Sequence, residues 1–207
     1  RVNISVAIIP MQEQFGWSDS QVGLIFSSFY IGYMITMALG GYLADKFGGK
    51  RVLGYGVILW SLFTILTPVA AHNGLFALFF IRILMGVGEG VTFPAWHSLY
   101  ARWIPFKERT RAISFTNSGI AIGTIIGNIG TQMIIVSMGW EWAFYLFGIV
   151  GLAWFYFWSR EVTSFPSEHK GISSYELTYI EKNAPSISTV RKIPFKKLLS
   201  NKPFLAI

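Results

Sequence analysis

Two residues of opposite charge lie inside a long apolar stretch of this sequence. Arg82 and Glu89 are the only Lys, Arg, Asp or Glu residues between positions 74 and 101. Seven residues of α-helix make almost two full turns, so the two side chains would lie on one stripe about 10 Å apart. A charge that faces lipid at the centre of a spanning helix is unfavourable by at least about 2.5–3.5 kcal/mol. We therefore expect the pair to face protein or a wet cavity, either as a functional site or as an internal salt bridge that fixes helix packing.

Two sets of glycines mark places where the chain can approach another segment closely. The first set surrounds the acid and consists of Gly86, Gly88 and Gly90. The second set is spaced by four residues and consists of Gly119, Gly123 and Gly127. Small residues on a membrane helix allow another backbone to come close. We expect the first set to admit a neighbouring helix or a solute, and the second to form one smooth face for tight helix contact.

The overall composition is that of a membrane protein. Hydrophobic residues make up 53% of the 207 residues and charged residues 13%, with a mean hydropathy of +0.49. A helix needs about 20 apolar residues to cross a bilayer. Five stretches meet this requirement and predict complete spans at residues 20–44, 52–71, 74–101, 110–137 and 140–160. The chain opens on the second half of a further predicted helix and closes on the start of another, so we expect an internal segment of a longer protein.

The net charge of +7 reports topology in this chain rather than a nucleic-acid partner. Fifteen of the 17 Lys and Arg residues lie in alternate connections between the predicted spans, at residues 44–51, 102–111 and 160–202. The other connections contain none. Basic residues concentrate in the cytoplasmic loops of membrane proteins. These three connections are therefore predicted to be cytoplasmic.

The tract after Arg160 is polar and basic. Ser173 followed by Glu176 matches a capping box, and Leu177 and Ile180 follow at helical spacing. We expect a short amphipathic helix that ends near residue 183 and lies along the cytoplasmic face. The alternative is a disordered tether.

A loop signature lies between the first two complete spans. The run from Gly41 to Arg51, GYLADKFGGKR, resembles the signature of the major facilitator superfamily, G-x-x-x-D-[RK]-x-G-[RK]-[RK]. Gly49 stands where the general pattern has a basic residue, and the resulting GGKR run is similar to one branch, the anion:cation symporters. That branch includes sialin, vesicular glutamate transporters, plant type-4 phosphate transporters and bacterial sugar-acid permeases. Five further runs resemble the same branch in the same order along the chain: RVNISVAI at 1–8, SSFYIGY at 27–33, RILMGVGEG at 82–90, PAWH at 94–97 and WIPFKERTR at 103–111.

This resemblance implies an all-α integral membrane protein. It implies the N-terminal six-helix bundle of a twelve-helix major facilitator fold, with the first helix truncated. Residues 1–160 would form that bundle, residues 161–202 a cytoplasmic interdomain linker containing the short helix, and residues 203–207 the start of the seventh helix. The C-terminal six-helix half of the same protein would supply the other wall of a central cavity.

The resemblance also implies which residues bind the substrate. Arg1 and Arg82 would contribute positive charge to an anion site in the central cavity. A guanidinium suits this role because it stays charged when desolvated and binds carboxylate or phosphate through a planar fork of donors. Glu89 is the candidate for proton coupling, because its protonation would release Arg82 to bind the anion.

Residue type and depth suggest further candidates. Tyr33, Asn117 and Ser118 offer neutral hydrogen bonds to the substrate, with helix packing as the alternative. His97 is a candidate proton relay, and the alternative is a packing or gate histidine. The candidates for a cytoplasmic gate, with solvated charges as the alternative, are Asp45, Lys46, Arg109 and Arg111.

Together these features predict a secondary active transporter. It would move an organic anion, such as a sugar acid or another carboxylate, in symport with a cation by alternating access, and we favour a proton over sodium. The alternatives are an inorganic phosphate transporter of the same family, a channel, or a non-transporting membrane solute sensor. An enzyme is not expected, because three His, no Cys and no Asp within the spans leave few groups for catalysis or metal binding.

The predicted partners follow from this function. They are a small anionic substrate, a co-transported proton or sodium ion, the lipid bilayer and the C-terminal half, with no nucleic acid, cofactor or metal. The membrane would be a bacterial inner membrane, or an organellar or plasma membrane.

Overall fold

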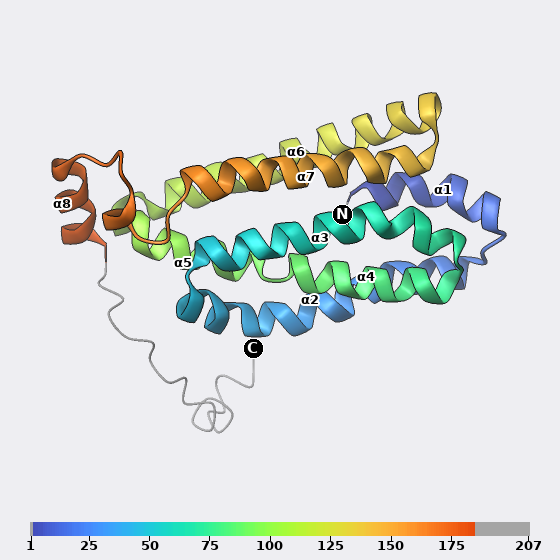
Figure 1. The fold of residues 1–207 in the computed structure, drawn as a ribbon, viewed down its shortest axis with the longest axis horizontal. Helices are drawn as coiled ribbons and strands as arrows, with labels where there is room; N and C mark the ends of the chain where they lie inside the picture. The colour runs from blue at the N-terminus through green and yellow to red at the C-terminus, as the bar shows by residue number, and fades with distance from the viewer. Residues whose placement is uncertain (1, 185–207) are drawn as a thin grey trace, which may run out of the picture.

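α-Helices make up nearly all of the computed structural model, which describes residues 2–184 (Figure 1). The α-helices of this part of the chain are α1 Asn3–Phe15, α2 Asp19–Phe47, α3 Gly49–His72, α4 Leu75–Glu89, α5 Thr92–Trp103, α6 Arg109–Met138, α7 Trp140–Glu161 and α8 Ser174–Asn183. Two short 3₁₀ helices, η1 Phe106–Glu108 and η2 Pro166–Glu168, lie after α5 and α7. The predicted all-α fold is confirmed. The predicted linker residues 185–202 and the start of a seventh helix at 203–207 lie outside the described residues.

Five segments of the described chain are long and apolar enough to cross a membrane. They are α2, α3, α4 together with α5, η1 together with α6, and α7. The five complete spans predicted from hydropathy are therefore present. The connections alternate between the two ends of the bundle, and the α2–α3 connection, the α5–α6 connection and α8 share one end (Figure 1). We call this the basic end, because the Lys and Arg residues of 44–51 and 102–111 lie there.

Within the signature run, a single residue connects α2 to α3. α2 ends at Phe47 and α3 begins at Gly49, so Gly48 alone makes the turn. Gly48 has a φ of +87°, in the left-handed region that favours glycine. A Cβ at this position would also lie 2.6 Å from Oγ of Ser164. The backbone conformation therefore explains this glycine of the motif.

The span from Leu75 to Trp103 is interrupted where α4 ends and α5 begins, at Gly90 and Val91. Pro94 explains the break. It has no N–H to donate to the carbonyl of Gly90 four residues earlier, and its ring clashes with that carbonyl in a regular helix. The span predicted over residues 74–101 is present as Leu75–Trp103, and it is built from two consecutive helices.

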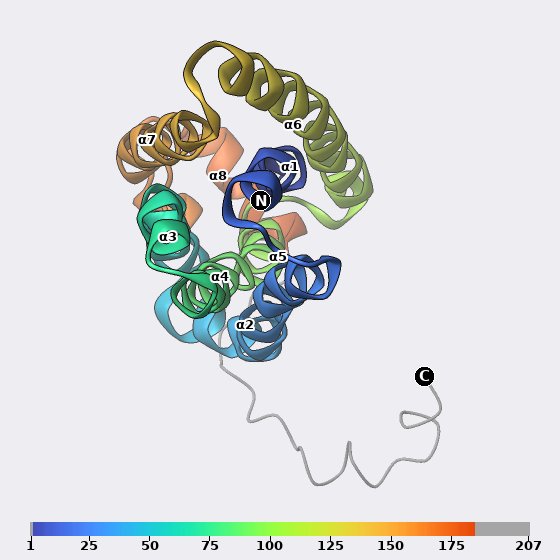
Figure 2. The same cartoon turned by 90° about the vertical axis from the view of Figure 1, so that its right-hand side faces the viewer.

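α4 lies between α2 and α3 and contacts both of them (Figure 2). A Cβ on Gly86 would overlap the backbone carbonyl oxygen of Phe29 in α2. A Cβ on Gly88 would lie 2.9 Å from the backbone nitrogen of Trp60 in α3. The predicted close approach at the glycines around Glu89 is confirmed, and neighbouring backbones rather than a solute occupy these positions.

Replacing Gly86 by alanine is expected to destabilise the bundle, because two backbones must separate to admit one methyl group. Overpacking of this kind typically costs about 1–3 kcal/mol. Gly23→Ala in α2 is the matched control, since a Cβ there meets nothing within 4 Å and alanine favours helix more than glycine does. The measurement is the thermal midpoint of the complete protein in detergent. Equal midpoints for the two variants would contradict the close α2–α4 contact.

The second set of glycines faces open space on α6. A Cβ at Gly119 or Gly123 meets nothing within 4 Å, and a Cβ at Gly127 meets only Val2, at 3.9 Å. Large apolar side chains of α6 are also exposed, including Phe115 at 83%. The tight helix contact predicted for this glycine face is therefore not made within the part of the chain that the structure describes.

The helix expected after Ser173 is present as α8. Oγ of Ser173 accepts a hydrogen bond of 3.1 Å from the backbone nitrogen of Glu176, which caps the helix. The hydroxyl of Tyr179 donates to the carboxylate of Glu108 in η1 at 2.8 Å. This hydrogen bond and the negative charge of Glu108 raise the pKa of Tyr179. α8 is thus tied to the α5–α6 connection, and a disordered tether is wrong for residues 174–183.

Candidate functional site

Arg82 lies in α4 with only 2% of its surface exposed. Its guanidinium carbon is 5.1 Å from the centre of the Phe29 ring in α2. Its Nη1 is 3.3 Å from the sulfur of Met85. A cation over an aromatic face is stabilised by the ring, and more so away from water, while arginine stays protonated when buried. The structure therefore holds a positive charge inside a membrane span, against α2.

Phe29 connects Arg82 to Tyr33. The Phe29 and Tyr33 ring centroids are 5.7 Å apart, one turn along α2. Phe29 is 1% exposed, so its ring has a defined position between the two. Sequence reasoning missed Phe29, although its place one turn before Tyr33 was an available signal.

Glu89 is the last residue of α4 and is partly buried. It follows Arg82 by seven residues, which places it on the same side of the helix about 10 Å further along. On the adjoining stripe, a Cβ on Gly86 would lie 2.9 Å from the backbone nitrogen of Tyr33 in α2, and a Cβ on Gly90 would lie 2.5 Å from its carbonyl oxygen. Ring contacts thus place Tyr33 and Arg82 on one line of contact between α2 and α4, and helix geometry extends that line to Glu89. We call this line the α2–α4 seam and define it by Phe29, Tyr33, Arg82 and Glu89.

A second polar group lies between α5 and α6. His97 and Asn117 line a small cavity of about 120 Å³ there, together with Tyr100 and Thr116. The Tyr100 and Thr116 hydroxyls are hydrogen-bonded to each other, and the His97 ring lies edge-on to Tyr100 with 6.3 Å between centroids. Two predicted residues thus meet in the fold. The two hydroxyls beside them were missed, although Tyr100 lies three residues after His97 on one helix face.

Two other predicted substrate residues are not placed in either group. Ser118 is exposed on α6, and its hydroxyl donates to the carbonyl oxygen of Ser114 in the same helix at 3.0 Å. Arg1 lies outside the described residues. Nearby in α1, the buried side-chain amide of Asn3 donates to the carbonyl oxygen of Ala143 in α7 at 3.4 Å. The roles of Arg1 and Ser118 stay predictions.

Asp45, one of the predicted gate residues, makes its contacts with α5 at the basic end. Its carboxylate accepts a hydrogen bond of 3.3 Å from the hydroxyl of Ser98. Its backbone carbonyl oxygen is 3.5 Å from Nη2 of Arg102. Ser98 and Arg102 were not predicted for this region, and neither lies in the signature run.

The other predicted gate residues have separate contacts. The ammonium of Lys46 lies 5.2 Å from the centre of the Phe47 ring. Arg109 donates to the carbonyl oxygen of Ile104 at 3.4 Å, and Arg111 lines a cavity of about 560 Å³ beside η1. In this conformation the four residues do not share one set of contacts, and their gate role stays a prediction.

Metal binding has no candidate group in the described chain. Within residues 2–184 the structure places no three His, Cys, Asp or Glu side chains where they could hold one ion. The α2–α4 seam offers the buried guanidinium of Arg82, a group that suits carboxylate or phosphate, and the partly buried carboxylate of Glu89.

The whole chain matches one family model. Residues 1–207 fit the model described as Major Facilitator Superfamily. The chain belongs to the major facilitator superfamily. The resemblance seen in the Gly41–Arg51 run is thereby confirmed at the level of the superfamily, and family membership together with the five apolar spans makes this a membrane-spanning protein.

Curated relatives of this major facilitator chain are named as transporters of anions. "Probable anion transporter 4, chloroplastic" of Oryza sativa subsp. japonica is 45% identical over 207 residues, which cover 100% of this chain and 35% of that protein. "Ascorbate transporter, chloroplastic" of Arabidopsis thaliana is 44% identical over 100% of this chain and 38% of that protein. "Sodium-dependent phosphate transport protein 1, chloroplastic" of the same plant is 44% identical over 100% of this chain and 40% of that protein. The chain thus spans well under half the length of these relatives, whose names agree with the anion:cation symporter branch.

Proposed function

We propose that this chain forms part of a secondary active transporter that moves a small organic anion in symport with a cation by alternating access. The observation that carries the proposal is the buried guanidinium of Arg82, held inside a span against Phe29. A planar fork of donors suits carboxylate and phosphate groups. The names of the rice and Arabidopsis relatives, an anion transporter and an ascorbate transporter, support an organic anion as the substrate.

Glu89 would couple the anion to the cation. On the α2–α4 seam, substrate anion and Glu89 compete for the same guanidinium. Protonation of Glu89 removes the competing charge and lets the anion bind Arg82, and release of the proton after transport restores the starting state. This cycle favours a proton as the coupled cation. His97, in α5, would relay it. The α5 helix runs from the break after α4 toward the basic end (Figure 1).

Symport of inorganic phosphate with sodium is the second candidate. One Arabidopsis relative is named a sodium-dependent phosphate transport protein. Arginine binds phosphate as readily as carboxylate, so the α2–α4 seam alone suits both substrates. In that case Glu89 would bind or respond to sodium rather than carry a proton.

The orientation and the membrane are part of the proposal. Basic connections face the cytoplasm or an equivalent compartment, so the basic end would lie on that side. Asp45, Lys46, Arg109 and Arg111 would make and break contacts there with the C-terminal half during the cycle. The chloroplastic names of the three relatives support an organellar membrane.

Counterflow in proteoliposomes that contain the complete protein tests the proposal. Vesicles are loaded with unlabelled ascorbate, glutamate or phosphate, and uptake of the same labelled anion is followed from outside. We expect saturable uptake that the internal anion accelerates, for an organic anion more than for phosphate. Phosphate counterflow alone would favour the second candidate. Uptake that never saturates would indicate a channel, and binding without flux a solute sensor, and either result would overturn the proposal.

A further inference from the structure

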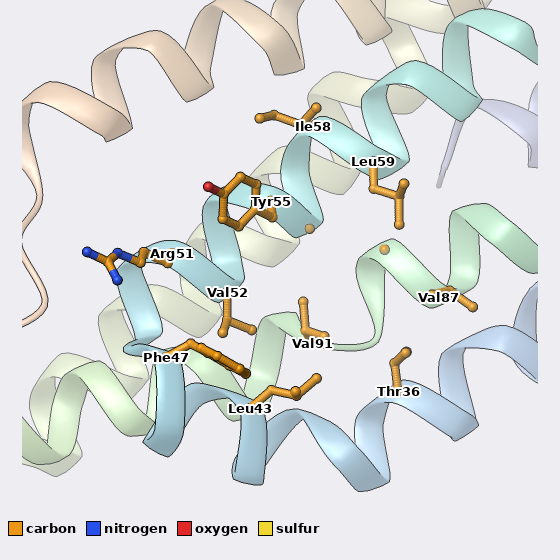
Figure 3. Close-up of a pocket in the computed structure, with 12 residues that line it drawn as sticks. Thr36, Leu43, Phe47, Arg51, Val52, Tyr55, Ile58, Leu59, Val87 and Val91 are labelled. Atoms are coloured by element: carbon orange, nitrogen blue, oxygen red, sulfur yellow. The ribbon is translucent and has the colours of Figure 1, made fainter.

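An apolar groove of about 680 Å³ runs along the outside of α2, α3 and α4 (Figure 3). Its floor is formed by Val87, Gly88 and Val91, and its walls by side chains of α2 and α3 such as Leu43 and Leu59. Gly86 lets α4 approach the α2 backbone closely, and Gly88 lets it approach the α3 backbone. Because Gly88 also has no side chain, the floor between the two neighbouring helices stays low. The structure thus leaves a hollow between α2 and α3 at membrane depth.

The groove lies on a different face of α4 from the α2–α4 seam. Consecutive residues of an α-helix are about 100° apart, so Val87 on the floor is about 160° from Glu89 and about 140° from Arg82. None of the four residues that define the seam lines the groove. An occupant of this groove would therefore not compete directly with the transported anion.

The groove ends in positive charge at the basic end. Arg51, the third residue of α3, is exposed and lines that end of the groove, where Figure 3 shows its guanidinium directed away from the apolar floor. Lys46 lies against the ring of Phe47, which is another wall residue. The nearby acid, Asp45, has its carboxylate bonded to Ser98 on α5 instead.

The remainder of the groove offers little to a polar ligand. Apart from Arg51, its polar side chains are Thr36, whose hydroxyl is already bonded to the carbonyl oxygen of Gly32 at 3.0 Å, and Tyr55. From Arg51 to Leu59 the groove follows α3 for about 12 Å. Its shape and charge suit a molecule with an apolar chain and one negative head.

We propose that this groove binds one anionic phospholipid, with an acyl chain on the floor formed by Val87, Gly88 and Val91 and with its phosphate group paired with Arg51. The lipid comes from the leaflet at the basic end. Acyl chains pack on any apolar helix surface, so the preference for one lipid must come from the shape of the hollow and from its charge. Basic residues near a membrane surface attract anionic lipids and, between helices, their head groups.

Native mass spectrometry of the complete protein tests this proposal with phosphatidylglycerol and phosphatidylcholine as the probes. We expect one retained phosphatidylglycerol and a weaker signal for phosphatidylcholine. Arg51→Gln should weaken phosphatidylglycerol binding about fivefold to tenfold. It should weaken phosphatidylcholine binding less, because the choline cation already offsets the phosphate charge that Arg51 attracts. Leu59→Trp, which fills the groove, should weaken both lipids.

The matched control is Arg160→Gln. Arg160 lies near the basic end of α7, where its guanidinium is 4.6 Å from the Tyr156 ring and outside the groove. It should leave phosphatidylglycerol binding unchanged, and the thermal midpoint of each variant shows whether the bundle is intact. The proposal is overturned if Arg160→Gln weakens binding as much as Arg51→Gln does, or if the two lipids bind alike. It is also overturned if inorganic phosphate displaces the lipid, or if the groove is covered by protein in the complete molecule or a dimer so that no lipid is retained.

Discussion

Arg82→Ala in the complete protein is expected to abolish anion binding and transport while leaving the bundle folded. Removing one partner of a buried charge interaction costs about 2–5 kcal/mol, which lowers affinity by about 30-fold or more. Arg82→Lys keeps the charge but loses the planar fork and the stacking on Phe29, so we expect it to bind weakly as well. The measurements are saturation binding of a labelled anion and its uptake into proteoliposomes.

Arg160→Ala is the matched control for this prediction, because it removes an arginine at the end of α7 that contacts only a surface aromatic ring in the described contacts. It should bind and transport as the unaltered protein does. The alternative for Arg82 is a purely structural charge. Unchanged affinity in Arg82→Ala, at an unchanged thermal midpoint, would show that the anion does not meet this guanidinium.

The membrane spans were predictable because the bilayer imposes a length and a polarity on each helix. The same constraint made Arg82 and Glu89 conspicuous, since a charge within an apolar span needs a partner or water. The break after Glu89 was also predictable in principle. Pro94 has no N–H to donate to the carbonyl oxygen of Gly90, so the helix is weakened at that turn for a local chemical reason.

Contacts between helices were less predictable. The contact between the Phe29 ring and the guanidinium of Arg82 depends on how α2 is rotated about its axis relative to α4. The apolar sequence of α2 does not determine that rotation. The same holds for Asp45, whose partner Ser98 comes from the far end of another span. Glycine spacing has a related limit. It shows that Gly119 and Gly123 make a smooth face, but it does not show what covers that face.

The depth of a residue along its helix can therefore be predicted from the sequence, whereas the neighbour that its side chain faces cannot. Sequence separation gave the depth of His97 and Asn117 independently, and only the fold shows that both border one cavity with Tyr100 and Thr116. The hydroxyls of Tyr100 and Thr116 carry no charge, so burying them in a span costs much less than burying a charge. Their positions in the sequence therefore do not mark them as site residues. The residues that sequence reasoning missed are uncharged for this reason, with Arg102 as the exception.

Glu89→Gln separates binding from energy coupling. The amide keeps the size of the side chain but neither competes as an anion for Arg82 nor exchanges a proton. We expect this variant to retain anion binding and counterflow and to lose uphill uptake driven by a pH gradient. A gradient of one pH unit supplies about 1.4 kcal/mol per proton, or tenfold accumulation, so the loss is from about tenfold accumulation to none.

The two readouts are made in the same vesicles, with exchange measured at equal pH and accumulation measured with the pH gradient imposed. Glu141→Gln is the control carboxylate, because Glu141 lies at the end of the bundle opposite the basic end, 3.6 Å from His72, and away from the α2–α4 seam. It should accumulate the anion normally. Full pH-driven accumulation by Glu89→Gln would remove Glu89 from the coupling mechanism. Accumulation by the unaltered protein that follows a sodium gradient and not the pH gradient would show that the proton is not the coupled cation.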